Sequence, residues 1–375
     1  YRLSSAQKPG MSAGSYVLEL QTVNGFLAPT QQTVVVIGGQ LKEVTFTYEM
    51  ANSAPTISNV VNQTINEDSH TGVIPVILND ADDAESSLVL TGTSSNTTLV
   101  PNINIDVSGS GANRNVTITP AANQSGTTTI TLTVTDGMLT DTDTFVLTVN
   151  SINDAPTITG IADQSTAANS VTDSLLFTID DVETPAASLT LGKTSSNPSL
   201  VPPANIVLGG SGSNRTVTVM PFTGQLGTSN ISVTVSDGAL TATHSFLLTV
   251  TGTALETWRF SKFGTSDNTG ASNDSADPDG DGQTNLEEYA AGTDPRDPVD
   301  VFKVLTSVKS GDSFTLTTSG KSGRIYTLLR SFDLSADTWT PLAALGPLAA
   351  DGTVVLTDQD AVFTKSFYRV QVTGP

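Results

Sequence analysis

The sequence predicts a mainly β protein in which β-sandwich domains follow one another, with one short helical segment before the last domain. Three observations lead to this prediction. Apolar residues alternate with threonine and other polar residues over many short stretches, which is the period of a half-buried strand. Glycine, proline and asparagine separate these stretches. Two stretches also repeat each other at a shift of 101 residues.

The first fifty residues predict a partial β module, residues 1–50. Its alternating apolar residues are Tyr16, Leu18, Leu20, Val34, Val36, Val44, Phe46 and Tyr48. At this size we expect either an incomplete sandwich or one half of a module whose start was removed. An incomplete sheet leaves an open strand edge, which invites pairing with another chain.

The repeat predicts two homologous domains, residues 51–151 and 152–252. Equivalent positions are Asn52/Asn153, Ser94/Ser195, Leu99/Leu200, Asn113/Asn214, Gly126/Gly227 and Asp136/Asp237. Late in each copy, two alternating strands enclose an Asp-Gly pair, and this pair predicts a type I′ hairpin turn. In the first copy their apolar residues are Ile130, Leu132, Val134, Phe145, Leu147 and Val149, and the second copy matches them. Several short strands in about a hundred residues indicate a β-sandwich.

Helical patterning replaces the β pattern in residues 253–299. Leu255, Trp258 and Phe263 fall near one helical face, and Gly264 is suited to end that helix. A second short helix is predicted from Asn285 to Ala291. From residue 300 the β pattern returns, so residues 300–375 predict a last small sandwich. Its expected strands are Phe314–Thr317, Arg324–Leu329, Thr353–Leu356 and Phe367–Val370.

Composition excludes several classes of function. The chain has 37 acidic and 16 basic residues, a formal charge of −21, so it repels nucleic acid and anionic lipid. No apolar stretch is long enough for a transmembrane helix, and we expect no membrane insertion. Cysteine is absent, which suits a secreted bacterial protein better than an animal ectodomain. Because the chain begins at Tyr1, we expect a processed product or a fragment.

Residues 277–288 read DPDGDGQTNLEE and match the calcium-loop template D-x-D-x-D-G-x5-E at every specified position. Alternating carboxylates on a tight loop supply the oxygen ligands that Ca²⁺ prefers, and a glycine at loop position 6 permits the sharp turn. The predicted metal ligands are Asp277, Asp279, Asp281, Gln283 through its backbone carbonyl, Asn285 directly or through water, and Glu288 as a bidentate ligand. Since the loop is single and sensor loops work in pairs, we expect a structural ion rather than a switch. Asp274 and Asp294 flank the loop as weaker candidates for a second ion.

Several motifs resemble known families. The repeats, with their NSAPT and NDAPT starts and TDG or SDG hairpins, resemble cadherin-like or immunoglobulin-like repeats of large bacterial surface proteins. The stretch from Trp258 to Pro295 is similar to the thrombospondin-type-3-like, EF-hand-like calcium segments of secreted proteins, which are common near the C-termini of Verrucomicrobia and Planctomycetes proteins. The ending Phe367–Val370 resembles the β module that closes those chains.

The cadherin resemblance implies calcium where the two repeats join. It would combine Glu67, Asn153, Asp154, Asp180 and Asp181. The second repeat lacks an acidic counterpart of Glu67 and Asp68, and no complete DxNDN linker is present. A solvated acidic loop is therefore the alternative for these residues and for the clusters Asp82, Asp83, Glu85 and Asp180, Asp181, Glu183.

No credible catalytic set emerges, and we predict that the chain is not an enzyme. His70 and His244 occupy unrelated positions in the repeats, and a wet strand face explains His244. No G-x-S-x-G motif supports a serine nucleophile. Trp258, Trp339, Tyr326 and Tyr368 could form a sugar-stacking platform, but we favour packing roles, with Trp258 on a short helix and Trp339 inside the last sandwich.

The sequence therefore predicts a secreted or cell-surface structural or adhesive protein, a calcium-stabilised rod of β-sandwich domains and a candidate subunit of an extracellular fibre. Expected partners are further copies of the chain, other surface proteins or glycans. The alternative is a non-catalytic accessory region of a larger secreted enzyme, with the repeats as spacers and the last sandwich binding carbohydrate.

Overall fold

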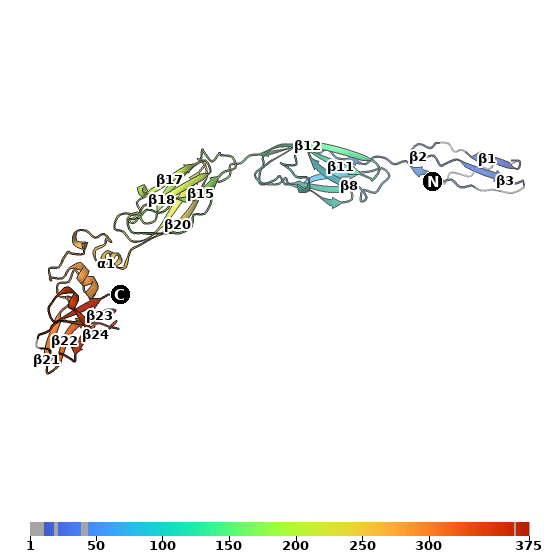
Figure 1. The fold of residues 1–375 in the computed structure, drawn as a ribbon. Coiled ribbons are helices and arrows are strands. Elements are labelled where there is room, and N and C mark those ends of the chain that lie inside the picture. The colour runs from blue at the N-terminus through green and yellow to red at the C-terminus, as the bar shows by residue number, and fades with distance from the viewer. Residues whose placement is uncertain (1–10, 19–21, 39–43, 364, 375) are drawn as a thin grey trace. The chain divides into compact units, whose positions relative to one another are not determined.

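The computed structural model describes residues 11–18, 22–38, 44–363 and 365–374. The chain divides into two compact units, residues 1–153 and 154–375. The first unit holds the N-terminal module and the first repeat, and the second unit holds everything that follows (Figure 1). Strands dominate both units, which confirms the predicted fold class. Among the described residues, no helix is long and apolar enough to cross a membrane.

Two small sheets make up the described part of the N-terminal module, β1 with β3 and β2 with β4. Their bounds are β1 Gly14–Leu18, β2 Phe26–Leu27, β3 Gln32–Val36 and β4 Glu49–Met50. The strand expected around Val44 to Tyr48 is absent, because these residues form no ladder and only the next two pair with β2. Leu20 lies outside the described residues. Val34 is the buried apolar residue of this region, so the described module has little core of its own.

The first repeat contains eight strands and one 3-10 turn. Their bounds are β5 Thr56–Ile57, β6 Gln63–Asn66, β7 Ile74–Asn79, β8 Val89–Ser94, η1 Asn102–Asn104, β9 Ile105–Ser110, β10 Asn113–Ile118, β11 Gly126–Thr135 and β12 Thr140–Asn150. The second repeat has the same elements in the same order. They are β13 Thr157–Ile158, β14 Gln164–Ala167, β15 Leu175–Asp180, β16 Thr190–Ser195, η2 Pro203–Asn205, β17 Ile206–Ser211, β18 Asn214–Val219, β19 Gly227–Ser236 and β20 Thr241–Thr251.

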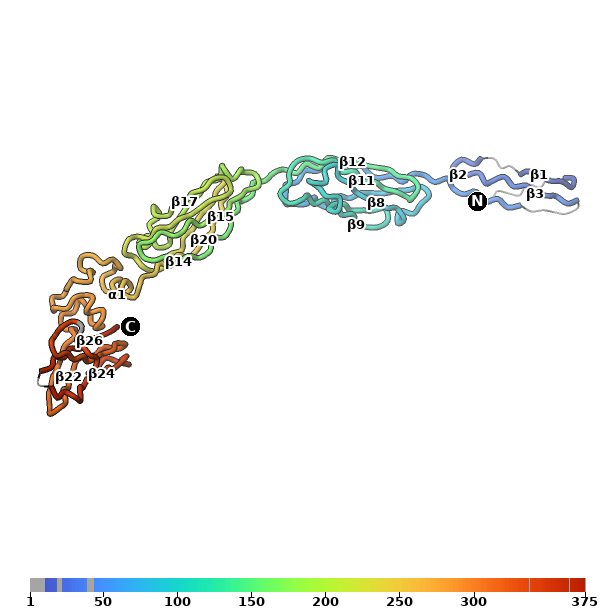
Figure 2. The backbone as a smooth tube through the Cα atoms, in the orientation of Figure 1, coloured from blue at the N-terminus to red at the C-terminus, as the bar shows by residue number. Residues whose placement is uncertain are grey.

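Each repeat is a sandwich of two four-stranded sheets. In the first, the strand orders are β5-β7-β10-β9 and β6-β12-β11-β8, and the second repeats both orders. Figure 2 shows the course of the backbone through each repeat. Most neighbouring strands are antiparallel, but β6 runs parallel to β12, and β14 runs parallel to β20. The alternating residues predicted for β11 and β12 are fully buried between the sheets, with exposures of 0 to 2 per cent. The threonine face of the pattern is the wetter one, as the period of two predicts.

Two local expectations in the repeats are wrong. The β11–β12 connection is a four-residue loop, and of its residues only Gly137 has a positive φ, at 105°. A type I′ turn needs positive φ at both central residues, so the turn is of another kind. His244 does not lie on the wet face of β20. Its side chain is half-buried and points to the same, inner side of the strand as Phe246. The Nε2 of His244 lies 3.1 Å from the carbonyl oxygen of Ile161.

Two helices follow the second repeat, as the sequence predicts: α1 Ala254–Phe263 and α2 Asn285–Ala291, with the 3-10 turn η3 Gly270–Ser272 between them. A capping box starts each helix, with Thr253 and Thr284 as the N-caps. Each helix ends at a left-handed glycine, Gly264 or Gly292. Trp258 lies edge-to-face against Tyr289, with ring centroids 5.5 Å apart, so the two helices pack on each other.

The last domain is a small sandwich of the sheets β21-β22-β25 and β24-β23-β26. Its elements are β21 Val304–Ser310, β22 Ser313–Gly320, β23 Ile325–Ser331, η4 Ala336–Thr338, β24 Thr340–Leu345, β25 Gly352–Asp358 and β26 Phe367–Thr373. The four expected strands are present, while β21 and β24 were not anticipated. Tyr326 is fully buried in the core, and Tyr368 stacks on Phe314 with centroids 3.8 Å apart. Trp339 does not fill this core, because it is only half-buried and lies outside the core cluster.

Candidate metal centres

The acidic loop between η3 and α2 is closed by its own first carboxylate. Asp277 accepts a hydrogen bond from the backbone N–H of Gly280 at 2.8 Å and another from Gly282 at 3.0 Å. Both glycines have positive φ, 78° and 92°, which residues with a side chain rarely adopt. The turn brings the carboxylates of Asp277, Asp279 and Asp281 together, with one oxygen of each within 4.8 Å of the others.

Glu288 comes from the first turn of α2 and is not part of this group of three, but its charge interacts with the charges of all three aspartates. Its side chain is completely buried, with an exposure of 0 per cent, and its Oε2 has no hydrogen-bond partner among the described residues. Burial, together with the negative charges of Asp279 and Asp281, raises the pKa of Glu288 to about 7. Burial also raises the pKa of Asp279. The Oδ2 atoms of Asp279 and Asp281 are likewise buried without a partner in the described structure.

The side chain of Gln283 is used elsewhere, and so is the side-chain nitrogen of Asn285, while the Oδ1 of Asn285 is buried without a partner among the described residues. The amide of Gln283 forms two hydrogen bonds with the backbone of Phe302, donating to its carbonyl at 3.4 Å and accepting from its N–H at 3.0 Å. Asn285 donates to the carbonyl oxygens of Ala271 and Asn273 at 2.8 and 2.7 Å. Their predicted roles, through a backbone carbonyl and through a direct or water-mediated contact, stay predictions.

The two flanking acids are engaged by cations. Asp274 forms an ion pair with the buried guanidinium of Arg259, and Asp294 forms one with Lys262 at 3.0 Å. Both basic residues come from α1, so these pairs fasten the loop segment to the first helix. A role for Asp274 and Asp294 in a second ion site finds no support in these contacts.

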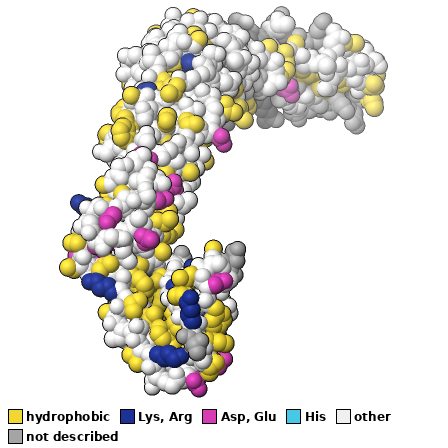
Figure 3. All heavy atoms as spheres, turned by 60° about the vertical axis from the view of Figure 1, so that its left-hand side comes forward, with side chains coloured by type: hydrophobic (Ala, Val, Ile, Leu, Met, Phe, Trp, Pro, Cys, Tyr) yellow, Lys and Arg dark blue, Asp and Glu magenta, His cyan; other side chains and the backbone are white. Residues whose placement is uncertain are grey.

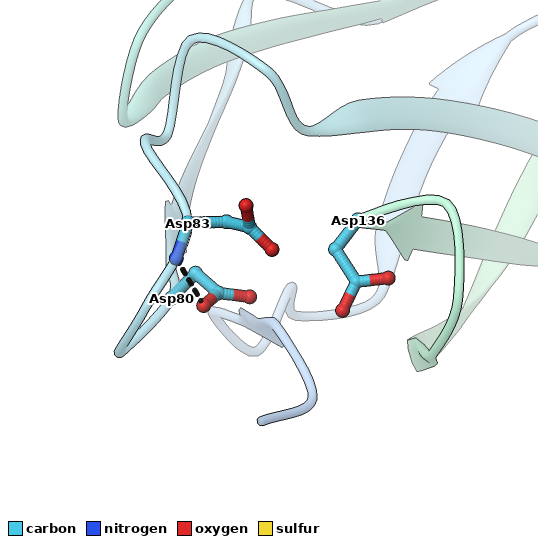
Figure 4. A group of neighbouring side chains, drawn as sticks. All are labelled: Asp80, Asp83 and Asp136. Carbon is cyan, nitrogen blue, oxygen red and sulfur yellow. Dashed lines mark hydrogen bonds between the residues drawn. The ribbon is translucent and has the colours of Figure 1, made fainter. Parts of the chain in front are cut away.

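A second cluster of carboxylates lies at one end of the first repeat, where Asp80 and Asp83 follow β7 and Asp136 begins the β11–β12 loop (Figure 4). Here backbone N–H groups take up most of the charge. Asp80 accepts from Asp82 and Asp83 at 3.0 and 2.9 Å, and these bonds lower its pKa. Asp136 accepts from Met138 and Leu139, and these bonds lower its pKa as well. Of the carboxylate oxygens in this cluster, only the Oδ2 of Asp80 is buried without a partner among the described residues.

The sequence interpretation missed Asp80 and Asp136 but contained a signal for them. Both recur at the 101-residue shift, as Asp181 and Asp237, whereas the counterpart of Asp83 is Thr184. Asp181 also accepts backbone hydrogen bonds, from Glu183 at 3.0 Å and Thr184 at 2.7 Å. In both repeats, therefore, this aspartate accepts backbone hydrogen bonds that stabilise the loop after β7 or β15.

The remaining residues predicted for the junction make contacts inside their own units. Glu67 is buried and accepts a hydrogen bond from the backbone N–H of Ile152 at 2.7 Å. Asp82 accepts from the N–H of Ser53 at 3.0 Å, and the second repeat reproduces this bond from Asp154 to Glu183 at 2.9 Å. These acids anchor the start or end of each repeat. Calcium shared by Glu67, Asn153, Asp154, Asp180 and Asp181 stays a prediction.

A comparison with protein families agrees with the sandwich architecture of the first repeat. Residues 52–150 match a family described as "Bacterial Ig domain". Among solved structures, the chain is similar to titin domains Z1Z2 in complex with telethonin, at 16% identity over 55% of this chain and 100% of that chain with a TM-score of 0.25. It is also similar to the titin immunoglobulin tandem A164–A165, at 12% over 54% and 100% with a TM-score of 0.23. An endo-fucoidan hydrolase of glycoside hydrolase family 107 matches at 18% over 64% and 34%, with a TM-score of 0.25.

No curated protein matches this sequence. The family match covers the first repeat, and the second repeat has the same strand orders in both of its sheets. The chain is therefore a multidomain protein that contains tandem immunoglobulin-like domains.

Proposed function

We propose that this chain is a secreted or cell-surface structural or adhesive protein in which one calcium ion stabilises the helical segment before the last domain. The observation that carries the proposal is the group of buried carboxylate oxygens in the loop at residues 277–288. Glu288, Asp279 and Asp281 each bury an oxygen that has no partner among the described residues. Leaving several buried negative charges uncompensated is costly, whereas a hard divalent cation satisfies all of them at once.

The donor set fits calcium. Asp277, Asp279, Asp281 and Glu288 offer carboxylate oxygens, Gln283 offers its backbone carbonyl, and Asn285 completes the proposed ligand set. A bound ion would neutralise the mutual repulsion of the carboxylates and hold the start of α2 against the loop. All of these ligands are oxygen atoms, which disfavours zinc and copper at this site.

Hydrogen bonds connect the helical segment to both of its neighbours. On the side of the second repeat, Ser266 donates to the carbonyl oxygen of Gly224 at 2.8 Å, and Asn169 donates to Asp267 at 2.9 Å. On the side of the last domain, the side chain of Gln283 is bonded to the backbone of Phe302. Because Gln283 belongs to the metal loop itself, loss of the ion would disturb the start of the last domain directly.

The tandem immunoglobulin-like domains and the match to a bacterial domain family support a surface or secreted location and a non-catalytic role. Assembly into fibres is part of this proposal. The described N-terminal sheets have two strands each, so their open edges can accept a strand from another copy of the chain.

Calorimetric titration with Ca²⁺ and limited proteolysis test the proposal. Wild-type protein is expected to bind one ion in this segment and to resist cleavage between residues 264 and 300 in calcium. The Asp279→Ala/Glu288→Ala variant is expected to lose this binding and to be cleaved there with or without calcium. Asp297→Asn, an exposed acid outside the loop, is the matched control and is expected to behave as wild type. Equal cleavage of the wild type with calcium and with chelator would contradict the structural role.

A further inference from the structure

Charge is distributed very unevenly along the chain. Residues 301–375 contain seven Lys and Arg residues against six Asp and no Glu, which makes the last domain net +1. Residues 1–300 contain the other nine basic residues and 31 acidic ones. In Figure 3, dark blue Lys and Arg side chains accordingly lie beside yellow apolar ones at the lower end of the molecule. The last domain therefore does not share the strong net negative charge of residues 1–300.

Three cations of this domain have no anionic or carbonyl partner among the described residues. They are Lys303, Lys365 and Arg369, whereas each of the other described basic residues donates to a carboxylate or a backbone carbonyl. Lys365 and Arg369 lie close together in sequence, at the start of β26. Both are exposed to solvent, and an anion can therefore reach them.

Aromatic rings hold these two cations in place. The guanidinium carbon of Arg369 lies 4.4 Å from the ring centroid of Trp339, and the Nζ of Lys365 lies 5.3 Å from that of Phe367. Phe367 and Arg369 are two residues apart on β26, so their side chains lie on the same face of the sheet, about 7 Å apart along the strand. We call the four residues Trp339, Lys365, Phe367 and Arg369 the basic face.

We propose that the basic face binds an acidic polysaccharide, one whose sugars carry carboxylate or sulfate groups. A guanidinium stacked on an aromatic ring keeps its N–H donors in the plane of the fork, where they can bind such a group through two parallel hydrogen bonds. Lys365 supplies a second positive charge, held over the ring of Phe367 on the same part of the domain. The half-buried ring of Phe367 offers an apolar surface for the C–H face of a sugar between them.

The charge of the remaining domains favours this occupant over two others. An anionic membrane is a broad surface that would also repel residues 1–300, whereas a single polysaccharide strand contacts only the last domain. A second copy of the chain offers its densest carboxylates at residues 277–288, and the proposed calcium ion would already engage them. The basic face contains no ligand of that loop, so polysaccharide binding does not depend on the calcium proposal.

Titration of the full chain with alginate, a polyuronate, and with dextran sulfate tests the proposal, with neutral dextran as the control polymer. Wild-type protein is expected to bind the two acidic polymers, more weakly as salt is added, and not to bind neutral dextran. The variant Lys365→Gln/Arg369→Gln is expected to bind at least about tenfold more weakly, since two charge-assisted contacts are lost. Arg369→Lys keeps the charge but loses the fork, so its affinity is expected to fall between the two.

Lys303→Gln is the matched control, because it removes an unpartnered cation that lies outside the basic face. It is expected to bind as wild type, and if it weakens binding as much as the double variant, the attraction is only a net-charge effect and the proposal fails. Binding to phosphatidylserine vesicles in place of the polymers, or concentration-dependent self-association that Arg369→Gln abolishes, would also overturn it. Lys365→Gln leaves the stack of Arg369 on Trp339 intact. This variant is expected to bind the acidic polymers more weakly than wild type, and it tests the proposal even if the Arg369 variants unfold. Repeating the titrations in chelator separates this outcome from failure of the calcium site.

Discussion

Two groups of three aspartates in this chain each bring their carboxylate oxygens within 4.8 Å of one another, but the groups differ in their surroundings. In the first repeat, Asp80 and Asp136 each accept backbone hydrogen bonds that stabilise the charged form, so their pKa values fall. Around the loop before α2, desolvation and neighbouring like charges raise the pKa of Asp279 in the loop and of Glu288 in α2. The first group uses its charge to hold the backbone, whereas the second lacks a positive partner. A rise of pKa in a buried cluster is thus the better pointer to a metal.

The largest expected effect is calcium stabilisation of the second group. At a free calcium concentration about a thousand times Kd, binding to the folded state alone stabilises it by about 4 kcal/mol. Glu288→Gln is expected to abolish this gain, because an amide cannot serve as a bidentate anionic ligand. Unfolding followed by the fluorescence of Trp258, which contacts Tyr289 of α2, measures it locally in a Trp339→Phe background. An unchanged calcium gain in Glu288→Gln would contradict the ligand assignment.

The pH dependence of the calcium-free protein comes next in size. Glu288 has a pKa of about 7 in the folded chain and 4.5 as its ordinary value, so the folded state holds its proton at pH values where the unfolded state has lost it. Stability is then fully present below about pH 4.5 and falls as pH rises through 7. The loss is at most about 3 kcal/mol, and less where water screens the loop carboxylates. Denaturation at pH 5 and pH 8 in chelator measures it, and Glu288→Gln is expected to remove it. If the wild type is more stable at pH 8 than at pH 5, the predicted direction of the pH dependence is wrong.

A smaller effect is expected in the first repeat. Asp80→Ala removes the acceptor for two backbone N–H groups, of Asp82 and Asp83, and should lower the melting temperature of this repeat. The loss should be the same with calcium and with chelator, since capping and not metal binding is removed. Calorimetry of the full chain measures it, and the unchanged second repeat serves as the internal control. A loss seen only in calcium would show that this cluster also binds metal.

The smallest effect is expected for Asp83→Thr, which installs the residue that the second repeat has at this position, Thr184. Burial and the nearby charge of Asp80 raise the pKa of Asp83, so removal of its charge should leave the melting temperature unchanged or slightly higher. The same calorimetric traces measure it. A clear loss of stability would mean that the Asp83 carboxylate makes a stabilising contact, which would contradict this prediction.

Local patterns predicted most of the fold. The period of two predicted the buried faces of β11, β12, β19 and β20. The spacing of Leu255, Trp258 and Phe263 before Gly264 predicted α1, and a second short helix was expected from Asn285 to Ala291, where α2 lies. The spacing of the calcium loop brought Asp277, Asp279 and Asp281 together as expected, because a short loop with two left-handed glycines fixes their approach.

Features that depend on distant segments were not predicted. Asp80 and Asp136 are 56 positions apart in sequence, and only the sandwich brings the loops after β7 and β11 together. Trp339 lies outside the core, and Arg369, from the start of β26, stacks on its ring across 30 positions of sequence. The side chain of Gln283 reaches the backbone of Phe302 across 19 positions. The spacing of residues in the sequence predicts none of these three contacts.

The parallel pairing of β6 with β12 has a mechanical consequence. Leu147 to Asn150 lie beside Gln63 to Asn66, so the first long strand of the repeat is bonded to its last. The chain passes the two-residue strand β5, then runs along β6, and it leaves the domain along β12, which runs in the same direction as β6. A pull on the two ends would therefore load their hydrogen bonds together in shear, and not one after another as in the peeling of a hairpin. The pairing of β14 with β20 would resist tension in the second repeat in the same way.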